Sequence, residues 1–241
     1  MNLNLKPSET SPNVYTRIGG VLYLFIIIAG ICSELFIRGN LIVSNDPAAT
    51  ANNIMASPFL WRLGIVADLL MHACDIPLMI IFYVLLRPVN KNLALVAVLF
   101  NLVQSAVMIA YKINLLQALF LLGNADYLKV FEPQQLHTLA YLAIRADLNG
   151  FGIGLIFFGF ACLVYGYLIL RSGYFPKILG VLMAIAGLSY LVNNFLLLLA
   201  PEFANILFLL PAFIAELSFC LWLIVKGVNM SKWNLKQTTT S

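Results

Sequence analysis

Apolar runs of about 20 residues recur along nearly the whole sequence. A helix needs about 20 such residues to cross the roughly 30 Å hydrocarbon core of a bilayer. The composition agrees, since 62% of the residues are hydrophobic and 10% are charged, against roughly 45–50% and about 25% in soluble domains. We therefore predict an all-α, polytopic membrane bundle, because lipid leaves backbone groups no hydrogen-bonding partner outside their own helix.

Hydropathy predicts six transmembrane helices, and proline marks several of their starts. Asp46-Pro47 opens a short segment between the first two spans, which is interpreted as a brief interfacial helix or a tight loop. RSGYFPK, 171–177, predicts a short turn. The predicted spans lie near residues 15–37, 59–86, 92–121, 138–170, 176–199 and 205–227, within one membrane domain, 15–229, flanked by tails at 1–14 and 230–241.

The charges predict the orientation of this bundle. Cytoplasmic loops of membrane proteins retain Lys and Arg, so the side richer in them is predicted to be cytoplasmic, and it carries both termini. The partners we expect are membrane lipids and a small-molecule or cation ligand, not nucleic acid, because no basic-aromatic surface is present. One side holds Lys6, Arg17, Arg87, Lys91, Arg171, Lys177, Lys226, Lys232 and Lys236, and the other holds Arg38, Arg62 and Lys129.

The cysteines and histidines predict neither a metal site nor a cofactor site. The four cysteines fall singly in four different spans, without a C-x-x-C pair, and are interpreted as small apolar packing residues. His72 and His137 differ in depth and are too few for the three-ligand set of most catalytic zinc sites. No G-x-S-x-G, H-E-x-x-H or kinase signature is present.

Ionisable residues inside the spans are the candidate functional residues. Measured from the basic ends of their helices at about 1.5 Å per residue, Asp75 lies about 18 Å deep and Glu216 about 15 Å deep. Such residues are costly in lipid and should face the interior of the bundle or water. A predicted midplane layer contains Asp75, Glu216, His72, Gln104 and Asn101, and a predicted outer layer contains Asp68, Lys112, Asn149, Asn193, Glu34, Arg145 and Asp147.

The spacing within the second span supports an inward polar face. Asp68, His72 and Asp75 are at i, i+4 and i+7 and form one helical stripe. Pro77 and Pro211 each lack an N–H and are predicted to free a carbonyl near the two midplane acids. The alternative is structural, because interior polar residues also tie helices together, and Asp68 with Lys112 suits a simple ion pair. Gly150 and Gly154 are interpreted as a close-packing device.

Several blocks resemble the bacterial membrane proteins grouped as domain-of-unknown-function family 4386. They are RIGGVLYL (17–24), DPAATANNI (46–54), YVLLRPVNKNLAL (83–95), GYLILRSGYFPKILGVL (166–182), GLSYLVNNF (187–195) and WLIVKGVN (222–229). The resemblance covers roughly residues 15–229. It implies a multi-pass protein of the bacterial inner membrane with about six helices, and it brings no activity or site residues with it.

Two functions from different classes, and a third interpretation, follow from these residues. The first is binding or movement of a small molecule, a cation or a proton through an outward-opening polar cavity that contains Asp75 and Glu216. The second is a membrane-embedded enzyme that acts on a lipid-like substrate, with the same acids as general acid and base. The third is a structural or regulatory membrane partner.

Overall fold

The computed structural model describes residues 11–238 and is helical throughout, with six helices long and apolar enough to cross a membrane in that part of the chain. The six spans are Pro12–Leu41, Pro58–Leu86, Lys91–Leu121, Pro133–Ser172, Lys177–Leu199 and Leu207–Val225. Each overlaps one of the predicted spans. The expected all-α bundle of six membrane-spanning helices is therefore confirmed.

Two of the spans are interrupted by irregular turns. The first consists of α1 (Pro12–Ile31), a π-helical segment η1 (Cys32–Arg38) and α2 (Gly39–Leu41). The third consists of α5 (Lys91–Tyr111) and α6 (Ile113–Leu121), which meet at Lys112. The other spans are α4 (Pro58–Leu86), α7 (Pro133–Ser172), α8 (Lys177–Leu199) and α9 (Leu210–Val225) with the preceding 3₁₀ turn η4 (Ile206–Leu209).

Local sequence explains where the helices begin and end. The Asp46 carboxylate accepts the Ala49 N–H at 2.9 Å and starts α3 (Pro47–Ala56), so this segment is a helix. Glu132 and Gln135 form a capping box at the start of α7. At the other end of α7, Gly173 has a φ of +75° and turns the chain into α8. The predicted short turn over 171–177 is confirmed.

Pro77 and Pro211, in the spans that contain Asp75 and Glu216, occupy different positions in their helices. Pro77 lies inside the continuous helix α4. Pro211 lies in the first turn of α9, where no helical hydrogen bond is lost. The expectation that Pro211 frees a carbonyl within its helix is therefore wrong, because the chain before it forms η4 rather than more α-helix.

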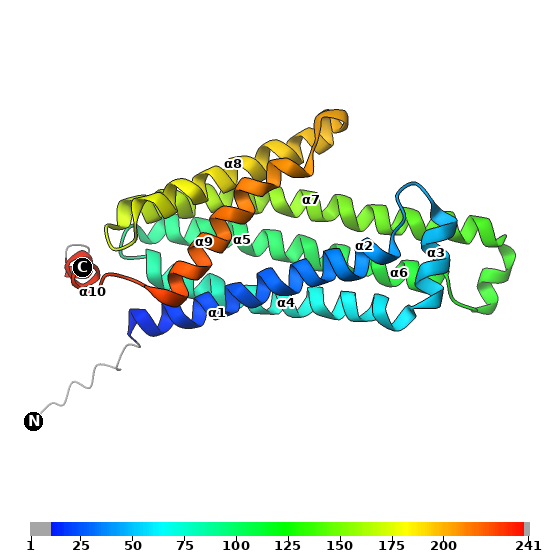
Figure 1. Ribbon diagram of the computed structural model, residues 1–241, viewed down its shortest axis with the longest axis horizontal. Coiled ribbons are helices and arrows are strands. Elements are labelled where there is room, and N and C mark those ends of the chain that lie inside the picture. Colours follow the sequence, from blue (N-terminus) through cyan, green and yellow to red (C-terminus); the bar gives the residue numbers. More distant parts are fainter. Residues whose placement is uncertain (1–10, 239–241) are drawn as a thin grey trace, which may run out of the picture.

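The six spans pack in a closed ring (Figure 1). α1 packs on α4, α4 on α5, α5 on α7, α7 on α8, α8 on α9, and α9 returns to α1. In Figure 1 the first residues of α1 and the last described residues of the chain lie at one end of the ring, which we call the terminal end, and α3 and α6 lie at the opposite, distal end. Short connections are η2 (Asp126–Val130) and η3 (Pro201–Phe203), and α10 (Met230–Thr238) follows the last span.

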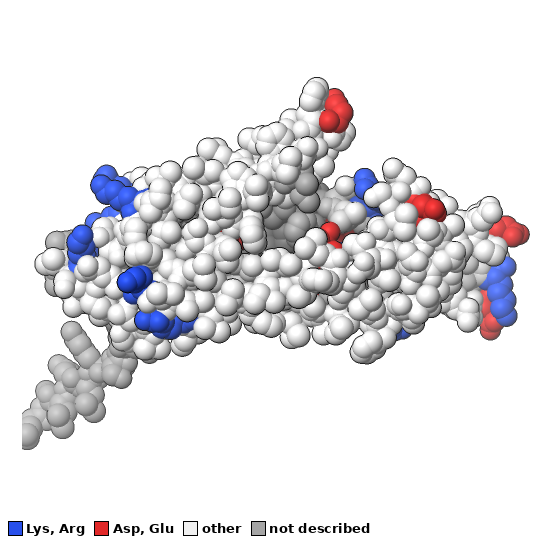
Figure 2. Space-filling model, in the orientation of Figure 1, with Lys and Arg blue, Asp and Glu red and all other residues white. Residues whose placement is uncertain are grey.

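Two apolar clusters occupy the two ends of the ring. The larger contains Phe82, Tyr165, Leu168 and Phe219 and fills the half toward the termini. The smaller contains Ile54, Trp61 and Leu115 at the distal end. Figure 2 shows Lys and Arg gathered at the terminal end, whereas the distal end carries both signs of charge. The predicted cytoplasmic location of the termini agrees with this distribution and stays a prediction.

Glycine permits the closest helix contacts of the ring. A Cβ on Gly166 would lie 2.8 Å from the carbonyl oxygen of Gly180, and one on Gly187 would lie 2.7 Å from that of Gly159. The two glycines on α7 are seven residues apart, and so are the two glycines on α8, so the helices meet closely at two points. Gly150 and Gly154 face Tyr111 and Met108 of the neighbouring span, where a Cβ would approach to 2.0 and 2.7 Å. The glycine pattern of α7 therefore acts in packing.

Gly166→Ala is expected to lower the melting temperature of the protein purified in detergent. The added methyl would meet backbone atoms of α8, which cannot move aside without separating the helices, at a cost of about 1–3 kcal/mol. The matched control is Gly30→Ala, since its Cβ would meet only the flexible Met71 side chain, at 3.4 Å. Equal thermal stability of the two variants would contradict the close packing of α7 on α8.

Candidate functional site

A cavity of about 140 Å³ lies at the centre of the ring, and all six spans line it. The predicted midplane residues Asp75, Glu216, His72, Gln104 and Asn101 all face this one cavity. Tyr23, Tyr165 and Tyr190 complete its polar lining, and the remaining lining residues are apolar or aromatic, with Cys162 among them. The structure thus brings together side chains from helices that are far apart in the sequence.

One polar group of the cavity is centred on Asp75 of α4. Its Oδ2 accepts a hydrogen bond from the Ser105 hydroxyl of α5 at 3.0 Å and lies 3.3 Å from Nδ1 of His72. His72 is itself buried, and its Nε2 has no hydrogen-bonding partner. The carboxylate of Asp75 therefore holds one side of the imidazole ring and leaves the other nitrogen without an interaction.

A polar chain continues along α5 from this group. Gln104 Oε1 accepts from Asn101 Nδ2 at 3.1 Å, and the Gln104 amide donates to the Met108 sulfur at 2.9 Å. Both amide side chains are buried. They give the α5 wall of the cavity groups that can donate to a ligand or accept from one.

The second polar group is centred on Glu216 of α9. The Tyr190 hydroxyl of α8 donates a hydrogen bond to its carboxylate, and Tyr23 of α1 interacts with the same group. Glu216 is only partly buried, because the cavity exposes it. Two acids from different helices thus share one cavity without direct hydrogen bonding between them.

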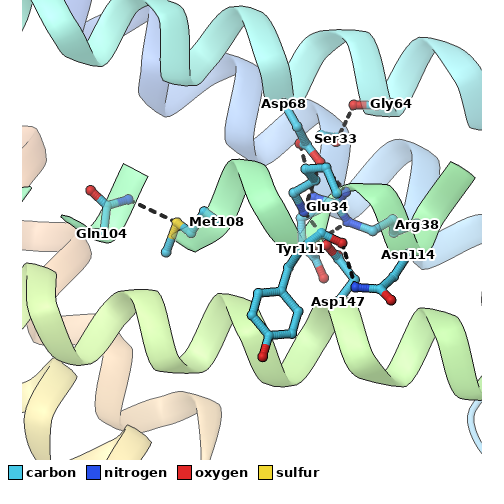
Figure 3. A network of polar contacts seen from close by, with 11 residues as sticks. Ser33, Glu34, Arg38, Gly64, Asp68, Gln104, Met108, Tyr111, Asn114 and Asp147 are labelled. Atoms are coloured by element: carbon cyan, nitrogen blue, oxygen red, sulfur yellow. Dashed lines mark hydrogen bonds and ion pairs between the residues drawn. The ribbon is translucent and has the colours of Figure 1, made fainter. Parts of the chain in front are cut away.

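A separate ion network lies beside the cavity, toward the distal end (Figure 3). Arg38 binds Asp68 through both terminal nitrogens, at 2.6 and 3.2 Å, and binds Glu34 through Nε at 2.7 Å. Lys112 Nζ lies 3.2 Å from Asp68 and 3.0 Å from Asp147. Arg38, Lys112, Asp68 and Asp147 are all buried, so two positive and two negative charges balance one another inside the bundle.

Each of the two helix irregularities contains a basic residue of this network. Arg38 is the last residue of the π-helical segment η1, and Lys112 lies at the junction of α5 with α6. π-helical turns are rare and occur frequently at functional sites. In η1 the buried residues are Ser33, Ile37 and Arg38, so this turn directs the Arg38 guanidinium into the interior rather than toward lipid.

Only some residues of the predicted outer layer belong to one network. Asp68, Lys112, Glu34 and Asp147 belong to the ion network, whereas Asn149 and Arg145 lie exposed on α7. Asn193 lines a different cavity of about 230 Å³, between α7, α8 and the residues before α9. This second cavity shares Phe151 and Leu155 with the central one. In Figure 2 the surface is hollowed between α9 and the distal half of the first span.

The polar residues of these sites that sequence reasoning missed include Arg38, Ser105, Tyr23, Tyr165 and Tyr190. Arg38 was counted with the loops, although it belongs to the first span, and its i,i+4 spacing from Glu34 was the available signal. Ser105, Tyr23 and Tyr190 are uncharged, so burial depth gives no reason to single them out among similar residues. Their roles depend on which helices become neighbours.

The lining of the central cavity suits a ligand that carries hydrogen-bond donors. Among residues 11–238, no group of three or more His, Cys, Asp or Glu side chains is placed to hold a metal ion. No Lys or Arg belongs to the residues that line the central cavity. Two carboxylates that face a small cavity without a Lys or Arg side chain attract positive charge.

The fold and the cavity define a polytopic α-helical membrane protein with a polar interior. The chain belongs to the family described as Domain of unknown function (DUF4386), whose model matches residues 18–227. It is similar to an uncharacterized protein of Archaeoglobus fulgidus, with 29% identity over 189 residues, which cover 75% of this chain and 96% of that relative. No solved structure matches. The family resemblance found in the sequence blocks is confirmed.

Lys112→Met is expected to destabilise the protein strongly, because it leaves Asp147 without its buried cation and takes one of two cations from Asp68. Breaking a buried ion pair from one side costs about 3–5 kcal/mol. The matched control is Lys129→Met, which removes a lysine that pairs with Asp126 at the exposed surface. Thermal unfolding in detergent measures both variants.

The double variant Lys112→Met with Asp147→Asn is expected to recover part of the lost stability, because the uncompensated carboxylate is then neutral. If Lys112→Met unfolded at the same temperature as Lys129→Met, the network would not stabilise the bundle. If the double variant were no more stable than Lys112→Met, Asp147 would not be the residue left unpaired.

Proposed function

We propose that this protein binds a small cation, which is a proton, an inorganic ion or a small organic cation, in the central cavity and moves it across the membrane. The observation that carries the proposal is the pair of carboxylates from Asp75 and Glu216 in a cavity that no Lys or Arg side chain lines. A carboxylate removed from water requires a compensating positive charge or a proton. The ligand supplies that charge in the proposed function.

The adjacent ion network supports this proposal, because the buried Arg and Lys side chains pair with acids of the network and not with the acids of the cavity. Arg38 and Lys112 are the Arg and Lys side chains buried within the described part of the chain, and both are paired with acids of the network. Asp75 and Glu216 have hydroxyl groups and an imidazole as partners instead. The two acids of the cavity therefore remain available for a cation from outside.

The surroundings of the cavity suit a protein that opens on one side. Toward the terminal end, the cavity is bounded by Tyr23, Leu78, Phe82 and Tyr165 of the larger apolar cluster. Toward the distal end, it adjoins the second cavity lined by Asn193 and Asn194. In each of these asparagines, Oδ1 has no hydrogen-bonding partner and is available to a passing donor. A cation would enter from the distal end and meet a closed apolar layer beyond Glu216.

One observation favours a second candidate, a membrane-embedded enzyme acting on a lipid-like substrate. The contact of His72 with Asp75 is the arrangement in which a carboxylate orients an imidazole for general base chemistry. The hollow beside α9 would admit an acyl chain from the side. The two candidates differ in outcome, because the enzyme requires a chemically altered product and the transport protein releases its ligand unchanged.

The cellular location forms part of the proposal. We place the protein in the bacterial inner membrane as a multi-pass protein with both termini in the cytoplasm. The gathering of Lys and Arg at the terminal end supports this orientation. The second cavity then opens toward the outer face.

Asp75→Asn and Glu216→Gln are each expected to leave the yield of folded protein intact and to abolish cation binding. Each change keeps the shape of the side chain and removes its charge. Thermal unfolding is measured in a buffer of a bulky organic cation, with sodium, potassium, methylammonium or benzylammonium added in turn. A cation at 100 times its dissociation constant stabilises the wild type by about 2.7 kcal/mol. Proton flux into liposomes containing the protein is followed with a trapped pH-sensitive dye.

The matched control is Glu202→Gln, which removes an exposed acid of η3. It should behave as the wild type in both measurements. If no added cation stabilised the protein and no proton flux appeared, the proposed function would be wrong. Equal loss of folded yield in Asp75→Asn and Glu216→Gln would favour the structural interpretation of these acids instead.

A reporter fused after residue 241 is expected to remain on the cytoplasmic side. Green fluorescent protein at this position should fluoresce, and alkaline phosphatase should be inactive, because it folds only after export. The same reporters in the loop between α8 and α9 should give the reverse result. An active phosphatase at the C-terminus would overturn the orientation.

A further inference from the structure

Aromatic rings form a large part of the wall of the central cavity. Phe82 contacts Tyr23 and Tyr165 edge-on, with ring centroids 6.0 and 5.2 Å apart, and Phe158 packs against Tyr190 at 5.4 Å. These contacts hold the rings in place before a ligand arrives. Aromatic faces attract organic cations, most strongly where water is excluded. The rings that line the cavity are Tyr23, Phe82, Phe151, Phe158, Tyr165 and Tyr190.

The polar atoms of the cavity call for a ligand that carries N–H donors. Because Nδ1 of His72 faces the Asp75 carboxylate, a neutral ring places its proton on Nδ1, and Nε2 is then a lone-pair acceptor. Nε2 is buried without a partner, as is the hydroxyl of Tyr165. Both side chains line the cavity and are at most 2% exposed. Together with the two carboxylates, these are sites that an N–H donor would satisfy.

Size and surface chemistry separate an organic ion from a hydrated inorganic one. The cavity volume of about 140 Å³ is close to that of an apolar cavity of about 150 Å³ that accepts benzene. Apolar side chains such as Ile26, Leu78 and Leu155 line it beside the rings. They offer no ligand to replace the water shell of a small inorganic cation, whereas they pack well against a hydrocarbon body.

We infer that the ligand is a small primary ammonium ion with an apolar or aromatic body of roughly benzene size. Its ammonium group lies between the carboxylates of Asp75 and Glu216, where it also donates to Nε2 of His72. Its body lies against the aromatic rings. The inference rests on the proposed function and narrows it, since it assigns the class of cation.

The test uses benzylammonium, which is benzylamine at neutral pH, titrated calorimetrically into the full-length protein in detergent. We expect saturable binding of one ligand per chain. Benzyltrimethylammonium keeps the charge and the ring but has no N–H, so it should bind at least about tenfold more weakly. Benzyl alcohol and benzoate, the uncharged and negative counterparts, should not bind.

Two variants connect the binding to this cavity. Glu216→Gln should weaken benzylammonium binding at least about tenfold, because a charge-assisted hydrogen bond is lost. Phe158→Leu should weaken it about 2- to 30-fold through the loss of a cation–π contact. The matched control for the second variant is Phe160→Leu in the same helix, since Phe160 stacks on Phe100 and does not line the cavity. The melting temperature of each variant is first compared with that of the wild type. If the Glu216→Gln variant fails to fold, Asp75→Asn is used in its place.

The outcomes distinguish this inference from the proposed function on which it rests. One outcome is that benzylammonium does not bind, while proton flux or the binding of an inorganic cation is lost in Glu216→Gln. The inference is then overturned and the proposed function stands. Equal binding of benzyltrimethylammonium or benzyl alcohol would overturn the assignment of a primary ammonium ion. Binding unchanged in Glu216→Gln would place the ligand outside this cavity and overturn it as well.

Discussion

The interior of a bilayer contains no water to solvate polar groups, and this constraint explains the arrangement of the whole protein. Each interior polar side chain must find a partner inside the bundle or face a space that admits one. The ring of six helices provides both solutions side by side. In the ion network, Arg38 and Lys112 neutralise Asp68 and Asp147 within hydrogen-bonding distance. In the central cavity, Asp75 and Glu216 lack such cations and face an open volume.

The ion network therefore stabilises the bundle, whereas the central cavity is the site of the proposed function. A balanced buried network has no charge left for a ligand, and its helix irregularities at η1 and Lys112 fix the distal half of the first and third spans. Apolar packing and the glycine contacts of α7 with α8 hold the remainder of the ring. The cavity acids, by contrast, are held by hydroxyl groups and the imidazole of His72, and neither has a Lys or Arg partner among the described residues.

The sequence predicts the helices well because lipid imposes a simple rule on length and hydrophobicity. Depth arithmetic also selected Asp75 and Glu216, since ionisable residues are rare in spans and each has a basic helix end to measure from. What depth cannot supply is the angle of each side chain around its helix and the identity of its neighbour. Asn193 and Arg145 share the depth of the ion network without joining it. Arg38 joins it because of a π-helical turn that hydropathy and residue spacing do not predict.

The closure of the ring by its first and last spans has a consequence for how the protein forms and moves. Every other pair of neighbouring spans is joined by a stretch of chain, whereas α1 and α9 meet through contacts such as Gly20 with Ile224 and Cys220 with the Gly20 carbonyl. During synthesis this seam stays open until the final helix has been inserted, so Glu216 is the last of the acids to arrive. In the finished protein, no loop joins α1 directly to α9, so a relative movement of these two helices would break contacts such as that of Cys220 with the Gly20 carbonyl rather than stretch a linker.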